Sequence, residues 1–391
     1  MSVQGALSKL KVIELNAIGP VPFAGMVLAD MGAEITRIDR IPFSVETSTE
    51  DIDVVHRGRR SIAIDLKTVE GLEVALRLID QADVLIEGFR PGVMEKLGLG
   101  PDVCLARNPR LIYGRMTGWG QEGPLAKFAG HDINYIALTG ALHAIGSAKL
   151  PPSPPLNLVG DYGGGAMLLL IGVLAALHAR ENDGKGQVVD AAMVDGAAML
   201  MAPIYSMLSQ GLWDDKRANN FIDGGAHFYS TYQCSDGKYI AIGAIEPDFY
   251  KLLLSKCDIN VSEYEGAADR EAWSNLKRKF ADIFQKKTRA EWCALLEESD
   301  ACFAPVLSLT EAPNHFHLRA RSTFMEIDGS MHPAPAPRLS RTKSAASTTI
   351  PQVGQHTEAL LTNAAYAAED VARLISNGVV YATHSGASEG I

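Results

Sequence analysis

Short apolar runs alternate with amphipathic segments through the first half of the chain. The apolar runs have the length and β-branched content of buried strands, and the segments between them have helical spacing. The predicted strands are residues 9–15, 34–38, 61–66, 83–89, 111–116 and 188–191. The predicted helices include residues 22–32, 68–82, 161–180 and 195–210. Strands separated by helices in this way predict an α/β fold with an open parallel sheet.

The pattern changes in the second half of the chain. Residues 222–250 alternate apolar and polar positions around the turn sequence SDG, which predicts a hairpin in a second domain. Residues 262–300 are charged and have amphipathic helical spacing. Residues 328–352 are rich in Pro, Ser and Thr and predict an extended connection, after which helical spacing returns at 356–376.

The composition is that of a globular protein, and its charge excludes one class of partner. The chain has 391 residues, of which 47% are hydrophobic and 21% are charged, and its formal net charge is −10. A protein that binds nucleic acid usually carries the opposite charge, so we expect no nucleic-acid partner. An anionic small molecule stays open, because a local group of basic residues can bind it.

The cysteines and the apolar segments indicate the compartment. The five cysteines are scattered without a CxxC pair, which favours free thiols in a reducing compartment over disulfides or a metal site. The N-terminal residues lack the pattern of a signal peptide. The longest apolar run, within residues 166–177, is interrupted by Gly172 and is shorter than the roughly 20 residues that span a bilayer. We expect a cytoplasmic protein that has no membrane partner.

Glycine-rich segments do not match the common nucleotide-binding motifs. A dinucleotide-binding GxGxxG would follow the first strand, where Pro20 and Pro22 occupy the turn instead. A formal GxGxxG occurs at residues 118–123, but Pro124 follows it and no strand with an acidic end comes after. We interpret residues 118–123 as a glycine-rich loop.

Four polar residues are candidates for catalysis. His131 and Asp132 stand where a helix is expected to begin, and N–H groups at a helix start can receive a developing oxyanion. Asp161 precedes three glycines that open an apolar helix, which suggests close approach of a ligand or of another backbone. Glu246 follows a β-like run. The alternatives are helix capping by either aspartate, a satisfied histidine in a turn and a solvated glutamate.

Basic residues stand near the carboxyl ends of the early predicted strands. Arg40 follows the second strand, Lys67 ends the third and Arg90 ends the fourth. Ligands of open α/β sheets bind at these strand ends, where Arg and Lys can hold phosphate by charge-assisted hydrogen bonds. A solvated basic surface is the alternative.

Longer motifs carry a resemblance to a known family. They include ELNAIGPVPFAGMVLADMGAEITRIDR, DVLIEGFRPGVMEKLGLGP, AGHDINY, PLNLVGDYGGG, GAIEPDFY and SDACFAPVL. In their order and spacing, the chain resembles the α-methylacyl-CoA racemases, a branch of the family III CoA-transferase (CaiB/BaiF) superfamily. GHDINY and GAIEP point to the racemase branch, because family III transferases share the aspartate without this pair of histidine and glutamate.

The resemblance implies an interlocked homodimer in which each chain has a Rossmann-like large domain and a smaller α+β domain. The expected boundaries are residues 1–190 for the first part of the large, CoA-binding domain, 191–224 for a helical linker, 225–330 for the small domain, and 331–391 for a return linker with the C-terminal part of the large domain.

The implied activity is the interconversion of (R)- and (S)-2-methylacyl-CoA thioesters by 1,1-proton transfer through an enolate. His131 and Asp161 resemble the family's acid–base pair, which acts on opposite faces of the carbon next to the thioester carbonyl. Glu246 matches a glutamate that orients the histidine, within the chain or across the dimer, and the backbone N–H of Asp132 would stabilise the enolate oxygen. The only partners implied are the acyl-CoA substrate and a second copy of the chain, with no separate cofactor and no metal. The alternative is a family III CoA transferase with Asp161 as the nucleophile.

The resemblance also implies the substrate-binding residues. They are Arg40 and Arg90 as basic contacts to CoA, Ile64, Asp65, Leu66 and Lys67 for its nucleotide part, and Gly130, His131, Asp132, Ile133, Asn134 and Tyr135 for the pantetheine–thioester end. Two departures from the family pattern stand out. Ala226-His227 replaces an Ala-Pro pair common in relatives, and the sequence after about residue 350 looks more like that of bacterial family III transferases.

Overall fold

The computed structural model describes residues 5–42, 54–260, 262, 266 and 268–383. The chain divides into two compact units. The large unit comprises residues 1–135, 157–200 and 322–391, and the small unit comprises residues 136–156 and 201–321. The chain therefore leaves the large unit twice and returns to it each time.

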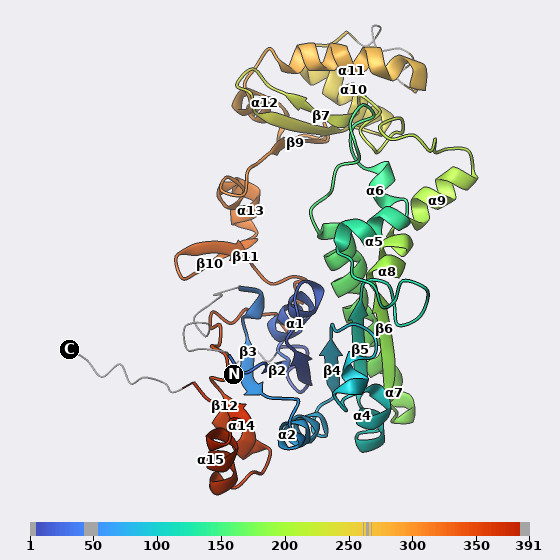
Figure 1. Cartoon of the computed structure of the whole chain (residues 1–391). Coiled ribbons are helices and arrows are strands. Elements are labelled where there is room, and N and C mark those ends of the chain that lie inside the picture. The colour runs from blue at the N-terminus through green and yellow to red at the C-terminus, as the bar shows by residue number, and fades with distance from the viewer. Residues whose placement is uncertain (1–4, 43–53, 261, 263–265, 267, 384–391) are drawn as a thin grey trace, which may run out of the picture. The chain divides into compact units, whose positions relative to one another are not determined.

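The core of the large unit is a seven-stranded sheet in the order β12-β3-β2-β1-β4-β5-β6 (Figure 1). Its strands are β1 (Lys11–Leu15), β2 (Glu34–Asp39), β3 (Arg59–Ile64), β4 (Val84–Glu87), β5 (Ile112–Thr117), β6 (Gln187–Ala192) and β12 (Val380–Tyr381). Neighbouring strands pair in parallel, except that β12 is antiparallel to β3. Each strand predicted from the apolar runs is present, and the α/β fold with a parallel sheet is confirmed.

Helices cover both faces of this sheet. Successive residues of a strand point to opposite faces, so a strand can contribute side chains to an apolar cluster on either side. Val12 and Ile13 of β1 accordingly belong to different apolar clusters. The cluster that contains Ile13 includes side chains of α2 (Val69–Ile79), α4 (Pro101–Arg107), α14 (Thr357–Asn363) and α15 (Ala368–Ser376). The cluster that contains Val12 includes side chains of α1 (Pro20–Asp30) and α7 (Met167–Asp183).

Two predicted helices are each divided in two. The segment 195–210 forms α8 (Met193–Leu200) and α9 (Ala202–Ser209), because Pro203 in the first turn of α9 has no N–H with which to continue α8. The segment 356–376 forms α14 and α15, which are separated where Ala365 adopts φ 62°. The remaining short elements are η2 (Val54–His56), α3 (Val93–Lys96), α5 (Asp132–Leu138), α6 (Ala141–Ala144), η5 (Ala312–Asn314), α13 (Phe316–Ala320), β10 (Phe324–Ile327) and β11 (Ser330–Pro333).

One helical stretch of the large unit, Leu158–Asp183, is long and apolar enough by length and composition to cross a membrane. The sequence suggests a shorter run, because Gly172 is taken there as an interruption. In the structure Gly172 continues α7, and a Cβ at this position would lie 2.5 Å from Val189 of β6. α7 precedes β6 and packs on β5 and β6, while Ile171 on its other side is 59% exposed. One face of this apolar helix therefore belongs to the core, and the opposite face is apolar and open.

The small unit contains an antiparallel sheet in the order β7-β8-β9. Its strands are β7 (Tyr229–Gln233), β8 (Tyr239–Gly243) and β9 (Phe303–Val306), and the predicted hairpin corresponds to β7 and β8. Its longer helices are α10 (Pro247–Lys256), α11 (Arg270–Phe284) and α12 (Arg289–Leu296). Ile240, Phe280 and Trp292 lie in the apolar cluster that joins these helices to the sheet.

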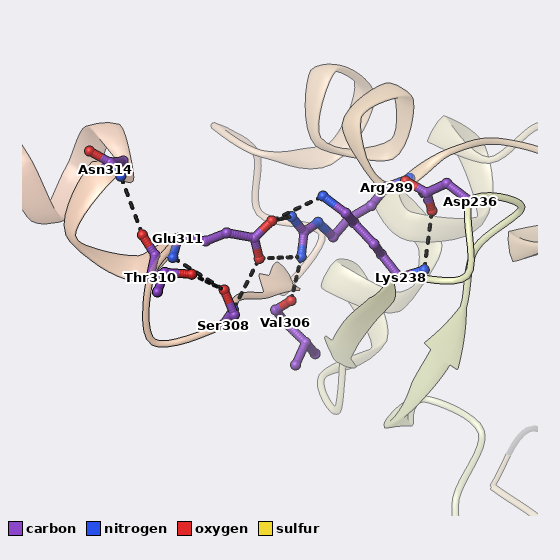
Figure 2. Close-up of polar contacts among 8 residues, drawn as sticks. All are labelled: Asp236, Lys238, Arg289, Val306, Ser308, Thr310, Glu311 and Asn314. Carbon is purple, nitrogen blue, oxygen red and sulfur yellow. Dashed lines mark hydrogen bonds and ion pairs between the residues drawn. The ribbon is translucent and has the colours of Figure 1, made fainter.

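A polar cluster ties the turn of this hairpin to the segment that follows β9 (Figure 2). Arg289, at the start of α12, donates hydrogen bonds to the carboxylate of Glu311 at 2.5 and 3.1 Å and to the carbonyl of Val306 at 2.6 Å. Lys238 of the hairpin also donates to Glu311, at 3.0 Å. Arg289, the N–H of Ser308 and Lys238 together hold the pKa of Glu311 well below its usual range.

The division into units differs from the expected domain boundaries. The sequence predicts residues 136–156 in the large domain, whereas they belong to the small unit. The expected linker 191–224 is divided near residue 200, because α8 packs against residues 158–166 of the large unit. The small unit ends at Arg321, so that the hairpin of β10 and β11 belongs to the large unit.

Candidate active site

One carboxylate connects the two segments that carry the candidate acid–base residues. His131 directly precedes α5, and Asp161 lies in a π-helix, η3 (Leu158–Ala166), which continues into α7. Oδ2 of Asp132 accepts hydrogen bonds from the backbone N–H groups of Gly160 at 2.6 Å and of Asp161 at 2.8 Å. Because Asp132 follows His131 in the chain, these charge-assisted bonds fix the start of α5 against the π-helix. Irregular helical turns of this type occur frequently at functional sites.

The backbone of His131 is held by the first turn of α5. Its N–H donates to Oδ1 of Asn134 at 3.0 Å, and its carbonyl accepts the N–H of Asn134 at 2.8 Å. Tyr135 donates its hydroxyl hydrogen to the carbonyl of Gly130 and packs edge-on against Trp119, with ring centroids 4.7 Å apart. A Cβ at Gly130 would lie 2.7 Å from the Tyr135 ring, so glycine leaves room for this ring beside the histidine.

His131 and Asp161 line the same cavity of the large unit, which has a volume of about 320 Å³. Its wall also includes residues that follow the carboxyl ends of three strands: Ile18, Gly19, Pro20 and Val21 at the start of α1 after β1, Gly88, Phe89, Arg90 and Pro91 after β4, and Gly118 and Trp119 after β5. Ligands of open α/β sheets bind at these ends. The cavity therefore presents an imidazole and a carboxyl group where a ligand is expected.

The carboxyl group of Asp161 is half-buried and its surroundings are close-fitting. Nδ2 of Asn157 donates to its Oδ2 at 3.1 Å. Gly19, which has φ 71°, also lies close, and a Cβ there would be 3.4 Å from the same oxygen. Burial raises the pKa of Asp161, and the negative charge of Asp132 adds to the increase, against the opposing effects of Asn157 and His131. The protonated acid is therefore more accessible to Asp161 than to an exposed aspartate.

The second of the three glycines that follow Asp161 is explained by the approach of another backbone. A Cβ at Gly164 would lie 2.5 Å from the backbone nitrogen of Ala197, and a Cβ at Gly196 would lie 1.8 Å from the carbonyl oxygen of Gly164. The π-helix and α8 thus cross with their backbones in contact. Of the two explanations open from the sequence, another backbone applies at Gly164.

A second cavity, of about 600 Å³, lies at the carboxyl ends of β1, β2 and β3. Its wall contains Arg40, a predicted basic contact to CoA, and the residues predicted for the nucleotide part of CoA, which are Ile64, Asp65, Leu66 and Lys67. The structure therefore brings these five residues together.

The loop after β4 forms part of both cavities. Phe89 lines the cavity that contains His131 and also the cavity that contains Arg40. Arg90 lines only the first of the two, so the predicted basic contacts are divided between the cavities.

Some of the predicted site residues lie outside the cavity of His131 and Asp161. Gly130 and Tyr135 line it, whereas Asp132, Ile133 and Asn134 do not, and Ile133 is 42% exposed. Glu246 belongs to the small unit, where it precedes α10 and its carbonyl accepts the N–H of Tyr250 at 2.9 Å.

Three contacts of the site are not foreseen from the sequence. The side chain of Asp132, considered there for its backbone N–H or as a cap, holds the chain around Asp161. Asn157 and Gly19 also contact or approach the carboxyl group of Asp161. Only Asn157 leaves a local signal, since it stands four residues before the aspartate.

Comparisons with known proteins find similar sequences and a similar fold. The sequence pattern of CoA-transferase family III matches residues 7–357. The α-methylacyl-CoA racemases of Mus musculus and Homo sapiens are 45% and 42% identical to the chain, and each alignment covers 96% of this chain and 97% of the relative. A CAIB/BAIF family protein from Brucella suis has a similar solved structure, with a TM-score of 0.80 and 26% sequence identity over 92% of this chain and all of that one.

Proposed function

Because the chain belongs to CoA-transferase family III, we propose that it interconverts (R)- and (S)-2-methylacyl-CoA thioesters. The observation that carries the proposal is the presence of His131 and Asp161 in the wall of one cavity. The mouse and human relatives, which match the chain over almost its whole length, bear the name of this activity.

The proposed reaction moves one proton at the carbon next to the thioester carbonyl. One of the two groups removes the proton, an enolate forms, and the other group protonates the opposite face. When His131 is the base Asp161 must be the acid, and the roles reverse for the other epimer. The raised pKa of Asp161 supports its part as an acid. Because only protons move, the proposal includes no metal and no cofactor apart from the CoA of the substrate.

The enolate places negative charge on the thioester oxygen. We assign its stabilisation to the backbone N–H of Asp132, the first residue of α5. The carboxylate of the same residue is already engaged with the N–H groups of Gly160 and Asp161, which holds the donor in place.

The two cavities suggest how CoA lies on the large unit. The nucleotide phosphates are proposed to bind beside Arg40 and Lys67 in the second cavity, and the thioester beside His131 in the first. Arg90, in the loop shared by both cavities, is then close to the path of the pantetheine arm.

We propose that the enzyme is a homodimer, as the family resemblance implies. The open face of α7 supports this, because Met167, Ile171 and Leu174 leave an apolar strip exposed on one helix. Glu246 is proposed to orient His131 within the same chain or across the dimer. The five cysteines, all free, fit the reducing cytoplasm where we place the enzyme.

Incubation of a single 2-methylacyl-CoA epimer in deuterated water tests the proposal. Without any added acceptor acid for CoA, we expect deuterium at the α-carbon and both epimers in the product. Asp161→Asn should slow racemisation by about 10²–10⁴-fold, because an amide cannot serve as the general acid or base. Deuterium exchange that begins with proton removal by His131 should persist for one of the two epimers. NMR and chiral chromatography of the released acids measure the two effects.

A family III CoA transferase with Asp161 as the nucleophile gives a different result. It would show CoA transfer that depends on an added acceptor acid and no deuterium at the α-carbon. This outcome would overturn the racemase proposal.

A further inference from the structure

Glu87 is a buried carboxylate that the proposed proton transfer does not use. It is the last residue of β4 and is 0% exposed. Its Oε2 accepts the backbone N–H of Phe89 at 2.7 Å, and its Oε1 accepts Nε–H of Arg115 at 3.0 Å. Glu87 thus holds the first residues of the loop that lines both cavities.

Arg115 joins the two ends of this loop. It lies on β5, and besides Glu87 it donates two hydrogen bonds to the carboxylate of Glu95 in α3, at 2.8 and 3.3 Å. Glu87 precedes the loop and Glu95 follows it, so one guanidinium group connects both sides. Phe89 and Arg90 lie between these two attachment points.

The loop itself is closely fitted at its first glycine. A Cβ at Gly88 would lie 2.9 Å from Cγ2 of Val21 in α1. The loop backbone therefore packs closely against α1, and we expect a change at Glu87 to move Phe89 and Arg90.

We propose that Glu87 is a positioning residue for CoA, which in its ionised form, held by Arg115, keeps Phe89 and Arg90 in place and makes the affinity for CoA dependent on pH. This inference rests on the proposed function, since it takes CoA as the ligand of the two cavities.

The ionisation of Glu87 falls in the neutral range. Burial raises its pKa to about 7 and Glu95 adds to the increase, while the Phe89 N–H and Arg115 oppose it. Tyr113 of β5 is a further titratable group that interacts electrostatically with Glu87. On the neighbouring strand β1, Glu14 stands opposite Ile86 in the pairing, and its side chain binds Arg59 instead. Above a pH of about 7 the ionised carboxylate of Glu87 attracts Arg115. Below this pH the carboxylate becomes protonated, and the ion pair with Arg115 is lost.

Titration of free CoA into the protein by calorimetry, between pH values of about 5.5 and 8.5, tests the inference. Lowering the pH over this range should raise the Kd for CoA in both proteins. We expect the factor of this rise to be about five times larger for the wild type than for Glu87→Gln. The variant is the reference because the phosphates of CoA also titrate there, equally for both proteins. In turnover at a pH of about 8, Glu87→Gln should raise KM with a much smaller effect on kcat, since the proton-transfer groups are untouched.

Two further variants sharpen the test. Glu95→Gln removes a negative charge from a side chain that is 45% exposed, which should lower the pKa of Glu87. The midpoint of the pH dependence of CoA binding should therefore lie at a lower pH in this variant than in the wild type. Arg40→Ala, in the wall of the second cavity, should weaken binding at every pH and leave the midpoint unchanged.

The outcomes separate the inference from the proposed function. A wild type that binds no CoA at any pH would contradict the proposed function and the inference together. Binding by the wild type with the same pH dependence in Glu87→Gln would contradict the inference alone. Should Glu87→Gln fail to fold, an unshifted midpoint in Glu95→Gln would overturn it.

Discussion

His227 shows how one buried side chain makes a unit of the protein sensitive to acid. The ring is 0% exposed, its Nε2 lies 2.8 Å from the hydroxyl of Tyr250, and it meets the rings of Phe228 and Phe280 edge-on. Its Nδ1 is buried without a hydrogen-bond partner among the described residues. Burial lowers the pKa of His227 to about 4. The neutral ring is therefore the form that the folded small unit accepts.

The stability of the small unit should consequently fall as the pH is lowered. The unfolded histidine has a pKa of about 6.5, so between about 6.5 and 4 the unfolded state binds more protons than the folded state. We expect the free energy of unfolding to decrease by about 2–3 kcal/mol across this range, and the contribution to be fully retained above a pH of about 6.5. Urea unfolding followed by tryptophan fluorescence measures it, since Trp213, Trp273 and Trp292 lie in the small unit.

His227→Gln is the matched control for this effect. Its amide can still hydrogen-bond Tyr250 but does not titrate, so its unfolding free energy should change less with pH than that of the wild type. Parallel pH profiles of the two proteins would show that His227 is not the responsible group.

The site residues show what local sequence can and cannot predict. His131 and Asp161 stand out by residue type and by the helix starts near them, and the structure places both in one cavity. The contact between the Asp132 carboxylate and the N–H groups before and at Asp161 joins segments far apart in the chain. No periodicity reports such a contact, because it depends on how two helices are packed.

At the scale of elements, the crossing of the π-helix and α8 places Asp161 by close packing. Gly164 and Gly196 allow the two backbones to touch. The apolar periodicity predicts helices over 161–180 and 195–210, but it contains no information on the distance between them. The glycines signal that something approaches closely, and only the fold shows that it is another helix.

Gly196→Ala should destabilise the large unit by about 1–3 kcal/mol, because its Cβ would lie 1.8 Å from the carbonyl oxygen of Gly164. The shift of α8 needed to relieve this contact should also reduce racemase activity. Thermal unfolding and turnover measure the two effects. Ala198→Ser, at an exposed position of the same helix, should leave both nearly unchanged. Equal stabilities of the two variants would contradict the close crossing.

The sequence predicts the parallel strands of the large sheet, but it does not predict the edge strand β12. The parallel strands contain short apolar runs, such as residues 84–86 of β4, which are buried on both faces of the sheet. β12 has only two residues, Val380 and Tyr381, and pairs with β3 from the other end of the chain. A strand this short has no pattern of its own, so its existence depends on the sheet that receives it.

At the scale of the whole molecule, the open apolar face of α7 calls for a partner surface. Met167, Ile171 and Leu174 are exposed on a helix whose opposite side is packed in the core. Transfer of such side chains out of water favours association, and a second copy of the chain is the partner that the family resemblance implies.

Ile171→Asp should therefore shift the protein from dimer to monomer and lower its activity. Sedimentation equilibrium of the wild type is expected to give twice the chain mass of 42.0 kDa, and that of the variant a lower average. Val69→Asp, at an 85% exposed position that starts α2, is the control and should remain dimeric. A monomeric wild type, or a variant as dimeric as the control, would contradict the assignment of this face.

The discontinuity of the large unit also has a consequence for synthesis on the ribosome. The sheet of the small unit is complete once β9 has emerged, whereas β3 keeps an unpaired edge until Val380 and Tyr381 are made. The apolar side chains of α14 and α15 that cover one face of the large sheet arrive equally late. The small unit is thus able to fold first. For most of its translation, the large unit has an exposed strand edge and a core that is covered on one face only. Exposed strand edges and apolar surface make a nascent chain prone to aggregation.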